Sequence, residues 1–313
     1  MNGLTELLAN KYILWGGFNL LVIAMLALDL GVFHRKDHKI GMKESLIWSV
    51  IWVLVALVFN VFVYFWKGPN TALEFFTGYL IERSLSVDNL FVFLLIFSYF
   101  KVPEQYQYKV LFWGIIGALV FRGIFIALGT FLIAQFSWIL YIFGAFLVYA
   151  GIKMAFAGDK EIEPEKNPTL RIMRKIIPIS KKYREGHFFT IKNGKKLATP
   201  LLVVLVVVES TDVVFAMDSI PAIFAITLDP FIVYSSNVFA ILGLRALYFA
   251  LAALMDMFHY LKYGLGLILS LVGLKMLLAS FFHIPIWIAL GSIILILVVS
   301  TVLSILFPKK EEK

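Results

Sequence analysis

Apolar residues dominate this chain in long runs separated by short polar segments. A helix needs about 20 residues to cross a hydrocarbon core, and nine runs are long enough. They lie at residues 12–33, 45–66, 72–99, 108–134, 137–157, 200–227, 231–255, 261–281 and 285–307. The pattern predicts an all-α polytopic membrane protein with about nine transmembrane helices, and a composition of 61% hydrophobic and 15% charged residues agrees with it.

The positions of the basic residues predict the orientation. Of the 28 Lys and Arg residues, 21 lie in alternate loops and the C-terminal tail, which would share one side of the membrane. Because cytoplasmic loops carry the excess of Lys and Arg, we expect the N-terminus outside and the C-terminus in the cytoplasm. This pattern explains the net charge of +8 without a nucleic-acid partner.

Residues 158–199 form the only sizeable polar segment and carry eleven bases against five acids. We expect them to contact anionic lipid headgroups. Asn193 and Gly194, between two short apolar stretches, predict a hairpin turn. The segment is either a regulatory loop or, more simply, a cytoplasmic connector.

The residue types exclude several classes of chemistry. The chain contains no cysteine, which rules out disulfides, thiol redox chemistry and thiolate metal sites. Its five His residues lie in polar segments or at the ends of apolar runs. No Gly-rich nucleotide-binding motif is present. We therefore expect neither an enzyme nor a permanently bound cofactor.

Charged residues inside the runs recur at nearly constant spacing, which indicates an internal repeat. The matched pairs are Asp88 with Asp212, Arg122 with Arg245, and Lys153 with Lys275. Each unit holds three runs, so the second unit must enter the membrane from the opposite face. Such inverted repeats are a common plan of secondary transporters.

The repeat divides the chain into five parts. Two transmembrane helices (1–71) precede the first three-helix unit (72–157), and the basic loop (158–199) leads to the second, inverted unit (200–281). A final helix and a cytoplasmic tail follow (282–313). The core is thus a three-plus-three helix repeat with three additional helices.

Acidic residues within the runs are candidate metal ligands. A carboxylate at the centre of a bilayer costs about 2.5 to 3.5 kcal/mol, so each needs a reason to be there. Oxygen-rich sites suit Mg²⁺, Mn²⁺ or Ca²⁺ and disfavour Zn²⁺ and Cu⁺. Pro221 predicts a break in its helix that would free backbone carbonyls as further ligands. The candidate ligands are Asp88, Asn89, Glu209, Asp212 and Asp218.

Ion pairing is the alternative role for these acids. Arg122 and Arg245 would neutralise Asp88 and Asp212 across the helix packing, while Glu82 would carry protons, support the ligands or pair with Arg83. The five acids, Glu82 included, nevertheless exceed the three arginines by two charges. That excess equals one divalent cation or two protons, so we assign Glu82 and the arginines to coupling or charge pairing.

Three motifs make the chain similar to the TerC family of integral membrane proteins, most closely to its Alx-type members. The first runs from Glu82 to Asn89, the second from Glu209 to Ala222, and the third is Ser236-Asn237-Val238-Phe239-Ala240-Ile241-Leu242-Gly243-Leu244-Arg245-Ala246. The resemblance implies an inner-membrane protein of the LysE-like transporter superfamily, linked to manganese export, alkaline pH and tellurite resistance. It is this resemblance that favours Mn²⁺ over Mg²⁺ and Ca²⁺.

The leading hypothesis is therefore a secondary transporter that exports Mn²⁺, with proton antiport as a plausible coupling. The rival is a membrane scaffold of a metal, tellurite or alkaline-pH stress complex that transports nothing. Geometry separates the two. Carboxylates that converge on a cavity favour transport, whereas carboxylates that each dock on an arginine in a closed interior favour the scaffold. The sequence leaves the oligomeric state open.

Overall fold

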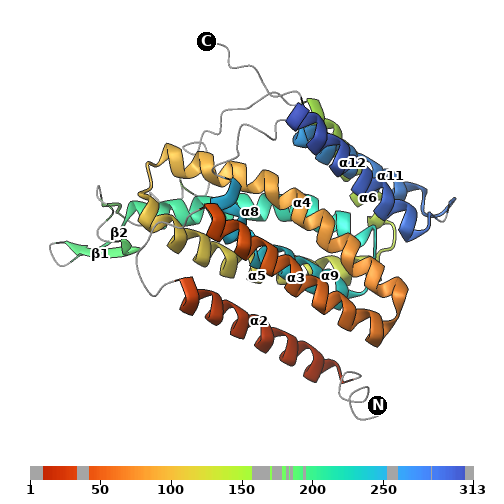
Figure 1. The fold of residues 1–313 in the computed structure, drawn as a ribbon, viewed down its shortest axis with the longest axis horizontal. Helices are drawn as coiled ribbons and strands as arrows, with labels where there is room; N and C mark the ends of the chain where they lie inside the picture. The colour runs from red at the N-terminus through yellow and green to blue at the C-terminus, as the bar shows by residue number, and fades with distance from the viewer. Residues whose placement is uncertain are drawn as a thin grey trace.

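The computed structural model is almost entirely helical, as predicted (Figure 1). It describes residues 10–33, 42–156, 178–180, 186–192, 195–251, 260–282 and 284–306, together with the single positions 170 and 183. The helices are α2 (Lys11–Phe33), α3 (Met42–Lys67), α4 (Pro69–Tyr99), α5 (Glu104–Gln135), α6 (Ile139–Phe156), α8 (Pro200–Phe224), α9 (Pro230–Leu242), α10 (Leu244–Leu251), α11 (Leu261–Leu278) and α12 (Ile286–Leu306).

Every predicted apolar run contains helix. Within the described residues, eight segments are long and apolar enough to cross a membrane, with α9 and α10 counted together. The remaining run forms α4, which spans 31 residues but also carries four charges. Those charged residues, Glu74, Glu82, Arg83 and Asp88, distinguish α4 from the others. Eight of the nine predicted transmembrane segments thus have the length and composition of a membrane span. The ninth, α4, is long enough but carries more charges.

Large apolar side chains cover the outside of the helices. On α3, Val58 is 71% exposed and Phe65 is 81% exposed, whereas Ala56 and Val63 face inward and are buried. Apolar surface of this extent would be unfavourable in water but matches the hydrocarbon interior of a bilayer. The helices therefore pack around a polar centre and present their apolar faces to lipid.

Four helices form the central bundle. Helix α4 packs on α8 and α9, and α5 packs on the same two helices from the other side. Helix α3 covers α4 and α10. Helix α2 runs along the outside of the bundle and contacts α9 (Figure 1). The central position of α4 explains how Glu82 and Arg83 are tolerated, because Glu82 is buried and Arg83 contacts α9.

Helices α6, α11 and α12 form a second group beside this bundle (Figure 1). Helix α6 packs closely against α11 through glycines that meet in two pairs. A Cβ atom at Gly151 would lie 2.4 Å from the carbonyl oxygen of Gly266, and one at Gly273 would lie 2.7 Å from that of Gly144. Small residues at both crossings let the two backbones touch.

A β-hairpin projects from the end of the bundle where α8 begins (Figure 1). Strands β1 (Phe189–Lys192) and β2 (Lys195–Ala198) are antiparallel, with Lys192 opposite Lys195. The predicted hairpin is confirmed, although its two turn residues lie outside the described residues. Tyr183 donates a hydrogen bond of 2.6 Å to the carbonyl of Phe100, which ties this segment to the end of α4.

The break predicted at Pro221 is wrong. Helix α8 continues through Pro221 to Phe224, so the single hydrogen bond that the proline cannot donate to the carbonyl four residues back does not end the helix. The interruption within the described residues lies instead between α9 and α10, at Gly243. A Cβ atom there would lie 2.8 Å from the guanidinium of Arg83, so this position suits a residue without a side chain.

The α6–α11 contact predicts a measurable difference between two glycines. Gly151→Ala should destabilise the protein by about 1 to 3 kcal/mol, because the added methyl meets backbone that cannot easily move. Gly291→Ala on α12 is the matched control, since a methyl group added there would have no atom within 4 Å. Thermal unfolding in detergent should show a lower Tm for the first variant only. Equal Tm values would contradict the close packing.

Candidate functional site

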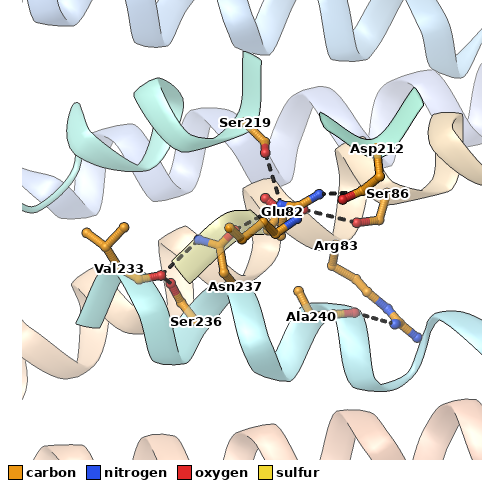
Figure 2. Close-up of polar contacts among 10 residues, drawn as sticks. Glu82, Arg83, Ser86, Asp212, Ser219, Val233, Ser236, Asn237 and Ala240 are labelled. Carbon is orange, nitrogen blue, oxygen red and sulfur yellow. Dashed lines mark hydrogen bonds and ion pairs between the residues drawn. The ribbon is translucent and has the colours of Figure 1, made fainter. Parts of the chain in front are cut away.

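Arg122 of α5 lies at the centre of the bundle with only 1% of its surface exposed. Its guanidinium pairs with the carboxylate of Glu82 on α4 and with that of Asp212 on α8, the latter at 3.3 Å (Figure 2). Both carboxylates are themselves buried. Because a buried charge is tolerated only with partners, this three-residue contact holds α4, α5 and α8 together.

Neutral oxygens complete the surroundings of the guanidinium. Arg122 also donates to the Ser219 hydroxyl at 3.1 Å and to the Asn237 amide oxygen at 2.9 Å (Figure 2). The amide nitrogen of Asn237 donates to the carbonyl of Val233 at 2.8 Å, which turns the amide oxygen toward Arg122. Helices α4, α5, α8 and α9 thus each contribute to one buried polar cluster.

Helical spacing accounts for which residues meet. Ser219 follows Asp212 by two turns of α8, so both side chains face α5. Ser86 follows Glu82 by about one turn of α4 and donates to its carboxylate at 3.3 Å. The cluster is therefore built from polar residues on the inner face of otherwise apolar helices.

Each carboxylate in the cluster retains an unused oxygen. Glu82 Oε2, Asp212 Oδ2 and Glu209 Oε2 are buried without a hydrogen-bond partner among the described residues. An unsatisfied buried acceptor costs about 1 to 3 kcal/mol, and more when it is charged. The cluster thus has acceptor capacity that its single arginine does not fill.

Glu209 lies one turn before Asp212 on the same face of α8, because residues three apart on a helix are neighbours, and the two carboxylates are close enough to interact electrostatically. Its carboxylate lies against Gly117 of α5, where an added Cβ would approach Glu209 Oε1 to 2.0 Å. Gly117 is thus the space that admits this acid between the two helices. Replacing the glycine would push the carboxylate away from α5.

A small cavity lies beside Asp212. Its volume is about 20 Å³, and Asp212 and Arg245 are the charged residues among its mostly apolar lining. A site of that size holds roughly one water molecule. The bundle is therefore closed around the cluster in this conformation.

The remaining candidate ligands lie elsewhere or are not placed. Asp88 belongs to α4, but its side chain is outside the described part of the structure. Asn89 is buried on the same helix. Asp218 lies on another face of α8, where Lys153 of α6 acts on it electrostatically. The described residues contain no group of three or more acidic or His side chains arranged to hold a metal, so the ligand set stays a prediction.

The other two arginines of the apolar runs, Arg83 and Arg245, have different partners. Arg245 of α10 pairs with Asp29 of α2 at 2.7 Å, which fastens the outer helix to the bundle. Arg83 donates to the carbonyl of Ala240 at 2.9 Å, at the C-terminal end of α9. A cation is favourable there because helix C-termini carry partial negative charge. Glu82 therefore pairs with Arg122, and Arg83 serves the interrupted helix instead.

Sequence reasoning did not assign roles to Ser219 and Asn237. Asn237 has no counterpart in the repeat, so its function stayed open. A usable signal existed, because an amide in the middle of an apolar run is costly unless it binds something. The spacing of Ser219 from Asp212 is a second signal, although serine is common in such helices.

The part of the chain that contains the four helices around Arg122 matches a known protein family. The model of the integral membrane protein TerC family matches residues 67–312. The chain belongs to the TerC family. The match excludes α2 and nearly all of α3, so the four helices around Arg122 all lie within the family region.

Relatives that align over nearly the full length of this chain support the same family. The membrane protein STKORF319 of Myxococcus xanthus is 52% identical over 293 residues, covering 94% of this chain and 92% of its own. A protein of Escherichia coli strain K12, named "putative membrane-bound redox modulator Alx", is 49% identical over 302 residues, covering 93% and 94%. No solved structure matches this chain.

The buried pairing predicts unequal effects for two ion pairs. Glu82→Ala should destabilise the protein by about 3 kcal/mol, because it leaves a buried guanidinium short of a charged partner. The control is Lys67→Ala, which removes a pair with Asp229 whose side chains are 28% and 31% exposed. That pair should contribute less than about 1 kcal/mol. Similar losses of Tm in detergent for both variants would contradict the central role of the Arg122 cluster.

Proposed function

We propose that this TerC-family protein is a secondary transporter that exports Mn²⁺ from the cytoplasm. The observation that carries the proposal is the polar cluster at the centre of the bundle. Glu82 and Asp212 bring two carboxylates to one arginine. Glu209 lies one turn before Asp212 on α8, and all three acids keep a buried oxygen without a partner among the described residues. Intramembrane carboxylates of this kind commonly mark ion pathways.

The chemistry of the cluster favours a hard divalent cation. Its donors are carboxylate, hydroxyl and amide oxygens, which Mg²⁺, Ca²⁺ and Mn²⁺ prefer. Once all three acids are deprotonated, Glu82, Glu209 and Asp212 carry two negative charges more than Arg122 balances, and one divalent cation would neutralise them. The choice of Mn²⁺ among these ions rests on the family. With no nucleotide-binding motif in the chain, an ion gradient or the membrane potential would supply the energy, and proton antiport is the coupling we propose.

Helix packing supports an inverted repeat. Helix α4 packs on α9 as α5 packs on α8, which are equivalent contacts if the two three-helix units are exchanged. The two glycine pairs between α6 and α11 are also equivalent when the units are exchanged. The repeat offset that relates Gly151 to Gly273 also relates Gly144 to Gly266, so it exchanges one α6–α11 crossing for the other. A two-fold axis in the membrane plane would produce this reciprocity, and rocking of one unit against the other would give alternating access.

A scaffold without transport activity is the second candidate, and the pairing of Glu82 and Asp212 with Arg122 in a closed interior favours it. The unused carboxylate oxygens favour transport instead. The redox role in the relatives' name would need groups other than thiols here, because the chain has no cysteine. Control of a redox-active cation is one such route.

Metal uptake by everted vesicles tests the proposal. Vesicles with the wild-type chain should accumulate Mn²⁺, and Asp88→Asn and Asp212→Asn should each lower the initial rate at least about tenfold. Asp229→Asn is the matched control, because asparagine also caps a helix well and Asp229 lies at the start of α9. Correctly inserted wild type that moves no Mn²⁺ would refute transport. Full activity in both Asp variants would refute the site.

A further inference from the structure

Arg122 occupies the position that a transported cation would take. Its guanidinium contacts Asp212, a candidate ligand, and Glu82, while both residues are almost fully buried. Arginine remains protonated at any physiological pH. The cluster therefore already contains a cation, covalently attached to α5, in the closed conformation.

The surroundings also provide a place for the guanidinium once the carboxylates are taken. Ser219 and Asn237 accept hydrogen bonds from Arg122 at 3.1 and 2.9 Å. Both acceptors are neutral and buried, so a cation would bind them less strongly than the carboxylates. Arg122 can give up its ionic partners and keep these two contacts, without leaving the interior of the bundle.

The carboxylates themselves have room for a second partner. Glu82 and Asp212 each use one oxygen for Arg122 and leave the other buried and unpaired among the described residues. The cavity of about 20 Å³ is lined by Asp212 and not by Glu82. An incoming cation would therefore first meet the Asp212 carboxylate and draw it away from the guanidinium, and Glu82 would follow.

We propose that Arg122 is a tethered competitor of the transported cation, and that the two bind Asp212 and Glu82 in turn. This inference rests on the proposed function. When the cation leaves, Arg122 returns to the carboxylates, so these buried anions are never without a positive partner. Leaving them unpaired would be strongly unfavourable, because a buried charge without a partner is not compensated for its lost hydration. The arginine would thus promote release of the cation and allow the empty carrier to return.

Equilibrium binding of Mn²⁺ to the full-length protein in detergent tests this competition. Arg122→Gln should bind Mn²⁺ at least about tenfold more tightly, since no guanidinium has to be displaced. The same variant should export Mn²⁺ more slowly, because nothing replaces the cation on release. Arg122→Lys restores the charge and should return the affinity toward that of the wild type.

Arg83→Gln is the matched control for charge. It removes a guanidinium from the residue next to Glu82, but one that binds a backbone carbonyl and no described carboxylate. Its effect on Mn²⁺ affinity should stay below about threefold. Tightening of equal size in Arg83→Gln and Arg122→Gln would overturn the competition, because it would reflect general electrostatics.

A second variant keeps the test decisive if Arg122→Gln does not fold. Asn237→Ala removes an acceptor that would hold the displaced guanidinium, so it should weaken Mn²⁺ binding about threefold or more. Unchanged or tighter Mn²⁺ binding by folded Asn237→Ala would overturn the competition, and this outcome does not require Arg122→Gln to fold. Where Arg122→Gln does fold, the Asn237 substitution should have no further effect in the double variant. A loss of affinity that persists there would make Asn237 a ligand and overturn its proposed role.

The outcomes separate this inference from the proposed function. Wild type that binds Mn²⁺, combined with unchanged or weaker binding in folded Arg122→Gln, overturns the competition and leaves transport standing. Wild type that neither binds nor transports Mn²⁺ overturns both. Tighter binding together with slower export is the result that only a displaced internal cation explains.

Discussion

The structure depends on the burial of one guanidinium among carboxylates from two neighbouring helices. Arg122 is contacted by α4, α8 and α9, so its position determines how these helices and α5 pack. In lipid, apolar side chains provide little preference for one helix arrangement over another. A charged group that must find its partners supplies that preference, and it does so at the centre of the bundle.

Two kinds of contact hold the helices together. The central bundle relies on polar residues, whereas α6 and α11 rely on the absence of side chains at the glycine crossings. The polar contacts are directional and admit rearrangement when partners change. The glycine contacts fit one geometry only. The described helices thus combine a close backbone contact with a neighbouring cluster of polar contacts.

The sequence predicted the helices well because long apolar runs have few alternatives in a membrane, and it predicted the hairpin from turn chemistry. It predicted the wrong helix break. Helix α8 continues through Pro221 to Phe224, and the interruption lies at Gly243, against the Arg83 guanidinium of a distant helix. The sequence also predicted more acids than arginines within the apolar runs. It did not predict that Glu82 pairs with Arg122. Which arginine meets which acid depends on helix rotation and tilt, and local patterns do not contain that information.

Under the proposed transport function, the size of the cavity beside Asp212 bears on which ion would be selected. A space of about 20 Å³ does not admit an ion with its shell of water molecules. Any cation that reached Asp212 in this conformation would have to arrive nearly bare. Mg²⁺ gives up its water reluctantly and demands near-ideal octahedral geometry. A closed cluster of this size would therefore disfavour Mg²⁺ through the cost of dehydration, in addition to any preference of the ligands.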